Sequence, residues 1–247
     1  MENLQKHRGN LTFSELLTKA EADDPVAMRE LALAYVNGQG VDQNLEKAEH
    51  WIEKAASLGD AEAQHEMADV IRATDGDPVE AFRWEQKAAE QGFPPAQNNL
   101  AFCFQNGTGT TKNPEKQFFW YQKAAENGIT ESQHQLAQCF LHGIGTSQDF
   151  QQAIYWLQQA SDGGHAIAKR KLGAAYMQGM GVAIDNEKGL ALLNEAASMG
   201  DQTAKELLMS GGRSSGSGGC LMLIAILGAS LITTACGLAF FVAVGMF

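Results

Sequence analysis

A repeat with a period of about 36 residues dominates this chain of 247 residues. Small residues begin six equivalent segments, at intervals of 36, 33, 36, 36 and 36 residues. These residues are Ala27, Ala63, Ala96, Ser132, Ala168 and Ala204. The shared motif reads, in the first segment, Leu31-Ala32, Tyr35, Gly38, Gly40, Trp51, Lys54-Ala55-Ala56 and Gly59. Such self-similarity restricts the fold to stacked copies of one helical unit, because a single copy cannot bury its own apolar face.

Each segment is predicted to fold as two helices. The first half carries apolar residues at i, i+4, i+5 and i+8, which share one helical face, and ends at Gly-x-Gly, where glycine permits positive φ. The second half spaces Ala, Trp and Ala-Ala by three and four residues and ends at another glycine. We expect the tryptophans to fill the space between helices: Trp51, Trp84, Trp120 and Trp156. The second segment has residues 74–78 in place of Gly-x-Gly, which predicts a tighter turn with both helices kept.

The Leu-Gly/Ala-x2-Tyr-x2-Gly-x-Gly and Lys-Ala-Ala-x2-Gly motifs resemble the Sel1-like repeat, a relative of the tetratricopeptide repeat. The resemblance implies an all-α fold, a right-handed α-solenoid of about five helix-hairpin repeats. The predicted repeats are residues 27–62, 63–95, 96–131, 132–167 and 168–203, with a C-terminal cap at 204–210. Within residues 1–26, Thr12-x2-Glu15 has the pattern of a capping box and predicts a capping helix over residues 12–22. Proteins with such repeats are mostly adaptors, so the resemblance implies protein partners and no cofactor.

Residues 221–247 contain no charged side chain. A helix needs roughly 20 apolar residues to cross a bilayer, so we predict a transmembrane helix at 220–247 after a flexible Gly/Ser linker at 211–219. No signal peptide is recognisable, and Lys205 and Arg213 precede the span, which favours a single-pass membrane protein with a cytoplasmic N-terminal body. Small residues at i, i+4 spacing offer a packing row for another helix: Ala225, Ala229, Thr233 and Gly237. Whether Cys220 is acylated stays open.

The first helices of the repeats carry the candidates for a protein-binding groove, because the corresponding helices of tetratricopeptide solenoids line a concave surface. Offsets 2, 6 and 9 from each first residue share a stripe away from the apolar face. This stripe consists of Arg29, Leu33 and Val36; His65, Asp69 and Arg72; Asn98, Phe102 and Gln105; His134, Gln138 and Leu141; and Arg170, Ala174 and Met177. Its polar groups suit an extended peptide backbone, and its cations suit an acidic segment. The alternative is a solvated polar stripe without a ligand.

Other classes of function are disfavoured. The chain carries 29 acidic against 18 basic residues, which argues against nucleic-acid binding. It has no HExxH, phosphate-loop or nucleophile-elbow motif, so we predict no catalytic residue and no enzymatic activity. His65 and His134 occupy the same repeat position two units apart, so no metal site is predicted. Cys103 and Cys139 occupy equivalent positions that are small and apolar in the other repeats, which predicts buried free thiols.

The sequence therefore predicts a membrane-tethered adaptor or scaffold that recruits protein partners through the concave surface of a repeat solenoid. The alternative is a regulatory subunit of a membrane enzyme complex that acts mainly through its transmembrane helix. The two hypotheses differ in whether the repeats or the apolar segment bind the partner protein.

Overall fold

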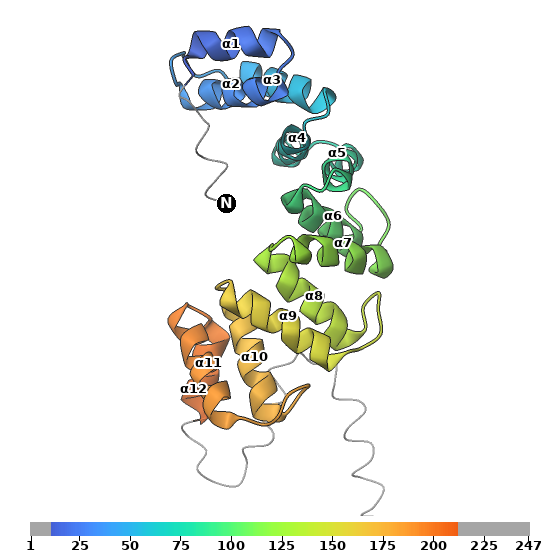
Figure 1. Cartoon of the computed structure of the whole chain (residues 1–247), viewed down its shortest axis with the longest axis vertical. Helices are drawn as coiled ribbons and strands as arrows, with labels where there is room; N and C mark the ends of the chain where they lie inside the picture. The colour runs from blue at the N-terminus through green and yellow to red at the C-terminus, as the bar shows by residue number, and fades with distance from the viewer. Residues whose placement is uncertain (1–10, 212–247) are drawn as a thin grey trace, which may run out of the picture. The chain divides into compact units, whose positions relative to one another are not determined.

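The computed structural model describes residues 11–211, and this part of the chain contains twelve α-helices and no strand (Figure 1). The helices are α1 (Phe13–Glu21), α2 (Pro25–Asn37), α3 (Leu45–Ser57), α4 (Ala61–Ala73), α5 (Pro78–Glu90), α6 (Pro94–Asn106), α7 (Pro114–Glu126), α8 (Thr130–His142), α9 (Phe150–Asp162), α10 (Ala166–Gln178), α11 (Asn186–Ser198) and α12 (Gln202–Gly211). They belong to two compact units, which divide between Ile129 and Thr130.

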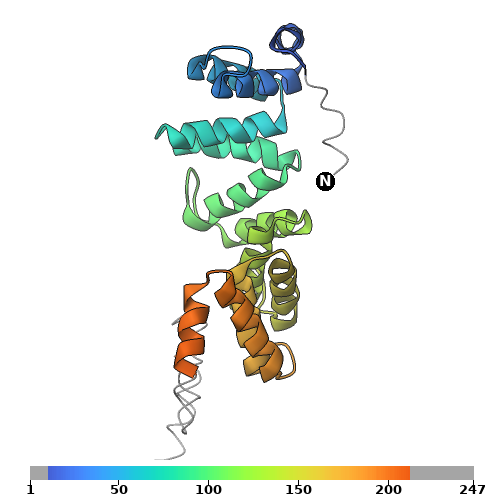
Figure 2. The same ribbon diagram turned by 90° about the vertical axis from the view of Figure 1, so that its left-hand side faces the viewer.

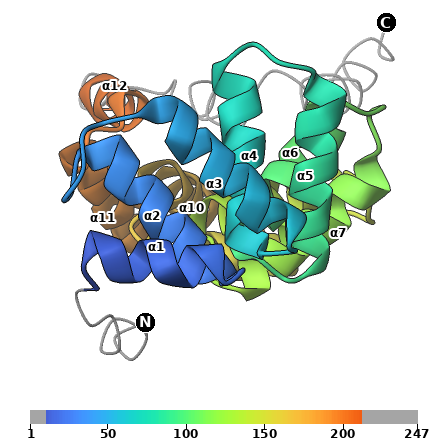
Figure 3. The ribbon, with the colours of Figure 1, turned by 90° about the horizontal axis from the view of Figure 1, so that it is seen from above.

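Helical hairpins build both units. In the first unit, α1 packs on α2, and the hairpins α2–α3, α4–α5 and α6–α7 follow one another, each helix packed on the next (Figures 2 and 3). In the second unit, the hairpins α8–α9 and α10–α11 pack together, and α12 packs on α11. The prediction of an all-α solenoid of stacked hairpins is confirmed.

Side-chain caps fix where the helices begin. Asp60 Oδ1 accepts a hydrogen bond of 2.8 Å from the backbone N–H of Ala63, which satisfies one of the free donors in the first turn of α4. At α1, Thr12 N donates to Glu15 Oε2 at 2.7 Å, and Thr12 Oγ1 accepts from Glu15 N at 3.4 Å. This reciprocal pair is the capping box that the sequence predicts.

Glycines end the first helices of four hairpins. Gly38, Gly107, Gly143 and Gly179 follow α2, α6, α8 and α10 with φ of 69°, 77°, 67° and 68°, a left-handed conformation that glycine adopts without steric cost. The second repeat differs: α4 ends at Ala73 and α5 begins at Pro78, so residues 74–77 make the turn. The predicted tighter turn with both helices kept is confirmed.

The core consists of leucines and closely packed alanines. The equivalent leucines of four first helices are completely buried, namely Leu31, Leu100, Leu136 and Leu172. Ala88 and Ala89 of α5 are also buried, so helix backbones approach closely there. The tryptophans lie at the edges of these clusters and are only partly buried, because the leucines occupy the centre. Cys103 and Cys139 are buried free thiols, as predicted.

Among residues 11–211, no helix combines the length and apolar character that a bilayer crossing requires. Gly211, the first residue of the predicted linker, ends α12. The rest of that linker and the predicted transmembrane helix at 220–247 lie outside the described residues. So do Cys220 and the small-residue row of Ala225, Ala229, Thr233 and Gly237.

Gly109→Ala is expected to lower the free energy of unfolding by about 2–4 kcal/mol. Gly109 has a φ of 67°, and a Cβ there would overlap the carbonyl oxygen of Pro78 and lie 2.7 Å from Cβ of Phe82. Gly92→Ala is the matched control, because Gly92 has a φ of 90° but no atom within 4 Å of the added carbon. The control should lose only about 1–2 kcal/mol. Equal losses in denaturant unfolding would show that the contact with α5 is unimportant.

Candidate functional site

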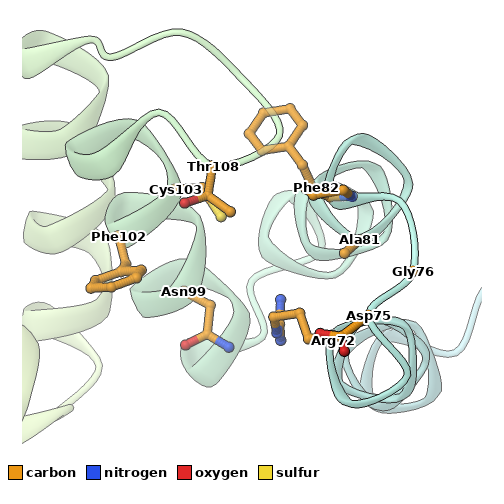
Figure 4. Close-up of a pocket in the computed structure, with 10 residues that line it drawn as sticks. Arg72, Asp75, Gly76, Ala81, Phe82, Asn99, Phe102, Cys103 and Thr108 are labelled. Carbon is orange, nitrogen blue, oxygen red and sulfur yellow. The ribbon is translucent and has the colours of Figure 1, made fainter.

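The first unit contains a cavity of about 510 Å³ between α4, α5 and α6. Arg72 of α4 and Asn99 of α6 face each other across it, and Phe82 and Thr108 lie at its other end (Figure 4). Phe102, a residue that is 55% exposed, belongs to the same lining. We call this site the α4–α6 groove. It combines polar donors with an exposed aromatic ring, as peptide-binding sites do.

A buried carboxylate holds the polar wall of the α4–α6 groove. Glu85 of α5 is 0% exposed. Its Oε1 accepts hydrogen bonds from Arg72 Nη2 at 2.5 Å and Asn99 Nδ2 at 2.8 Å. The Nδ1 atom of His65 lies 3.2 and 3.1 Å from the two carboxylate oxygens. A buried charge needs such partners, since an unpaired carboxylate in this environment would be strongly destabilising.

Glu85 is an exception among the repeats. The position after the tryptophan, or after Leu192 in the last repeat, is otherwise an apolar or aromatic residue, namely Ile52, Tyr121, Leu157 or Leu193. Only the second repeat places a carboxylate there. Sequence reasoning missed Glu85, although a comparison of the repeats at this position would have found it.

The groove is electronegative on balance. Arg72 pairs with both Asp69 and Glu85, and Asp75 lies on the cavity lining. Burial and the charge of Glu85 raise the pKa of the Cys103 thiol to about 11, so this lining thiol is uncharged at neutral pH. Burial by itself lowers the pKa of His65, but the hydrogen bond and charge of Glu85 outweigh it and raise the pKa overall.

The structure places several predicted stripe residues at the α4–α6 groove. Arg72 and Phe102 line it, and His65 and Asp69 join the network around Glu85 and Arg72. Asn98 is partly buried and donates to the neighbouring Asn99 Oδ1 at 3.4 Å.

The side chains of Gln105 and Gln138 make hydrogen bonds outside the α4–α6 groove. Gln105 Oε1 accepts a hydrogen bond of 2.6 Å from the hydroxyl of Tyr121. Gln138 Oε1 accepts from Lys171 Nζ at 2.9 Å. Their interactions are with neighbouring helices of their own unit.

Arg29 and Arg170 form joints between repeats. Arg29 Nε lies 2.8 Å from Oδ1 of Asp60, the N-cap of α4. Arg170 Nε lies 2.9 Å from Oδ2 of Asp201, just before α12. Both guanidinium groups are largely buried and committed to these carboxylates. The prediction that they are available to an acidic ligand is therefore corrected, because the next repeat supplies their counter-charge.

Two further stripe positions are buried and correct the predicted exposure of the stripe. Leu141 is 4% and Ala174 is 0% exposed. His134 is also buried, at 7%, and its ring stacks on that of His165 with centroids 4.6 Å apart. The stripe is therefore not a continuous exposed surface: His134, at offset 2, lies against His165, the N-cap of α10, and Leu141 packs in the core of the second unit.

Comparison with protein families identifies these hairpins. The Sel1 repeat matches residues 25–60, 61–93, 94–129, 130–165 and 166–201. The chain is a Sel1-repeat protein. Each matched repeat begins two residues before the segment start predicted from the sequence, at residues 27, 63, 96, 132 and 168.

Solved structures of Sel1-repeat proteins resemble this one. A Sel1 repeat protein from Oxalobacter formigenes is 28% identical, with a TM-score of 0.71, and the match covers 78% of this chain and 81% of that chain. The protein c5321 of uropathogenic Escherichia coli, described as a protective antigen, is 26% identical with a TM-score of 0.65. That match covers 79% of this Sel1-repeat protein and half of the E. coli chain, at 50%. The comparison with curated proteins returned no match.

Two groups of side chains have the composition of metal ligands, although the sequence predicts no metal site. They are His65, Asp69 and Glu85 in the first unit, and Glu131, His134 and His165 in the second. In the first group, the guanidinium of Arg72 already contacts both carboxylates and takes the place that a cation would need. His65 lies on α4, His134 on α8 and His165 in the loop before α10. Because these histidines are far apart in sequence, their spacing gives no metal-binding motif.

His65→Gln is expected to destabilise the protein by about 1.5–3 kcal/mol at pH 6 and by clearly less at pH 9. Since the pKa of His65 is raised on folding, its stabilising charge is fully present below the unfolded pKa of about 6.5 and is lost as the pH rises through the folded pKa. Denaturant unfolding at both pH values measures the difference. In a Glu85→Gln background most of this pH dependence should be lost, and the remainder is due to Asp69, whose carboxylate also raises the pKa of His65. An undiminished pH dependence there would show that Glu85 is not the main partner that raises the pKa.

Proposed function

We propose that this Sel1-repeat protein is an adaptor that binds a segment of a partner protein in the α4–α6 groove and holds that partner at a membrane. Sel1-repeat solenoids are generally scaffolds for protein–protein interaction, and proteins of this family are typically not enzymes. The observation that carries the proposal is the placement of Arg72 and Asn99, both held by the buried Glu85, beside the exposed ring of Phe102.

The polar wall of the groove is ordered before a ligand arrives. Arg72 makes its hydrogen bonds through Nη2, and among the described contacts its Nη1 and Nε retain their donors. Glu85 thus fixes the guanidinium while leaving part of it for a ligand carbonyl oxygen. A donor that is already immobilised loses little conformational entropy on binding, which favours affinity.

The charge of the groove favours a neutral or basic extended segment. Asp69, Asp75 and Glu85 outnumber the one arginine, and Arg29 and Arg170 are committed to joints between repeats. An acidic ligand segment, which the sequence suggested, would meet net repulsion at this groove. We therefore infer that an extended backbone accepts from Arg72 while an apolar side chain enters beside Phe82.

The membrane part of the proposal rests on the sequence. Residues 221–247 carry no charge, and a helix of that length is long enough to cross the hydrocarbon core. Lys205 and Arg213 precede the span, which favours a cytoplasmic position for the repeats. The acidic repeats, in a chain of net charge −11, would be repelled from anionic lipid and would extend away from the surface.

Phe102 is expected to lie in the partner interface. A photo-crosslinking phenylalanine at position 102 of the full chain should form a discrete covalent adduct in cells, and Phe102→Asp should reduce partner capture roughly tenfold or more. The matched control is Tyr155 of α9, which is 53% exposed against 55% for Phe102. Equal adducts at both positions, or none at 102, would contradict a partner site in the α4–α6 groove.

Deletion of residues 221–247 is expected to release the protein from membranes. The full chain should stay with the membrane pellet after alkaline washing, because a spanning helix resists extraction, while the deletion variant moves to the supernatant.

A second variant replaces the segment with an unrelated apolar helix. It should retain partner capture if the groove makes the contact. Loss of capture in that variant would favour a regulatory subunit that acts through the row of Ala225, Ala229, Thr233 and Gly237. Extraction of the full chain would rule out the anchor.

A further inference from the structure

The second unit brings two imidazoles and one carboxylate together where two repeats meet. Glu131 and His134 lie on α8, and His165 precedes α10 as its N-cap. One ligand atom from each of the three residues lies within 4.8 Å of the others. His165 Nε2 lies 2.9 Å from Glu131 Oε2, and His134 Nδ1 lies 3.9 Å from Glu131 Oε1. We call this group the His134–His165 cluster.

His134 is unusual because it is buried without a hydrogen-bond partner. Its residue is 7% exposed, and neither Nδ1 nor Nε2 has a partner among the described residues. At 3.9 Å the Glu131 oxygen is beyond hydrogen-bonding distance. Buried polar groups are nearly always satisfied, so two unpartnered nitrogens on one ring call for an explanation. A ligand that accepts the lone pair of a neutral imidazole would satisfy one of these two nitrogens.

We propose that Glu131, His134 and His165 bind a divalent transition-metal ion of the Zn²⁺ class, which links α8 to the start of α10. Two neutral imidazoles and a carboxylate are a preferred donor set for such ions. Ligand atoms of a tetrahedral Zn²⁺ site lie about 3.3 Å apart, so side-chain shifts of about an ångström or slightly more close the present separations. Three protein ligands leave the fourth position to water.

Two neighbours set limits on the affinity. His165 Nδ1 accepts a hydrogen bond of 3.1 Å from Ala168 N, and coordination through Nε2 would move the ring proton to Nδ1 and break this cap. Lys171, whose ammonium group donates to Gln138, adds a positive charge near His134. We therefore expect binding in the micromolar range and weaker than in a closed structural zinc site.

The position of the cluster within the repeat suggests what the ion does. His134 and His165 occupy the same repeat positions as Arg29 and Asp60 in the first unit and as Arg170 and Asp201 in the second. At those joints an ion pair connects the first helix of one repeat to the start of the next first helix. A pair of histidines cannot form that ion pair unaided, but a metal ion between them makes an equivalent connection.

Cobalt titration of the tag-free full chain in detergent micelles tests the site, because Co²⁺ in a tetrahedral site has characteristic visible absorption. The expected result is one Co²⁺ per chain, displaced by Zn²⁺. The double variant His134→Arg/His165→Asp recreates the Arg–Asp joint of the neighbouring repeats and should fold while losing binding at least 100-fold. Glu131→Gln, at a residue that is exposed, should weaken binding at least tenfold. His65→Gln, which alters the other ligand-like group, should leave binding unchanged.

A thermal readout separates a site in the folded protein from incidental coordination. Zn²⁺ should raise the unfolding temperature of the parent chain and of His65→Gln, but not that of the double variant, because a ligand stabilises only the state that binds it. Absence of Co²⁺ absorption in the parent at millimolar Co²⁺ would overturn the proposal. So would binding that persists in both the double variant and Glu131→Gln. Neither result would affect the adaptor proposal, whose groove lies in the first unit.

Discussion

At two joints, a single carboxylate at the start of a helix connects one repeat to the next. Asp60 Oδ1 accepts from Ala63 N at 2.8 Å and so begins α4, and the same oxygen lies 2.8 Å from Arg29 Nε of α2. Asp201 repeats the arrangement in the second unit, with Ala204 N at 2.8 Å and Arg170 Nε at 3.0 Å from its Oδ1. Because one side chain serves both as helix cap and as ion-pair partner, the placement of a repeat is coupled to the local structure of the next.

The middle repeats have other side chains at this joint. His65 lies against Phe93, with ring centroids 5.4 Å apart, and His134 stacks on His165. His65 occupies the repeat position that Arg29 and Arg170 have in those joints. It contacts the buried Glu85 instead of a helix cap, and Glu85 also binds Arg72 at the α4–α6 groove. The two groups to which we assign binding roles therefore arise where the joint differs. A solenoid tolerates such differences because each repeat contacts only its neighbours, so the effect of a substitution stays local.

Glu85 shows how a buried charge is tolerated at this site. A carboxylate in a position that is apolar or aromatic in the other repeats is destabilising by itself, but His65, Arg72 and Asn99 surround it with donors. Replacement of the whole group by apolar residues would cost little stability, as it often does for buried ion pairs. Function is therefore the better explanation for the group, since it presents an ordered arginine beside Phe102.

The sequence by itself determined the number of repeats, the two helices in each, the glycine turns and the capping box at Thr12. All of these follow from local rules on periodicity and backbone conformation. It also placed Arg72 and Phe102 together on one stripe. Only the tertiary structure decided that Arg29 and Arg170 are committed to Asp60 and Asp201, that Glu85 lies behind the groove, and that His134 meets His165. The reason is physical: a partner about 30 residues away is chosen by the stacking of hairpins, and helical periodicity within one segment contains no information about it.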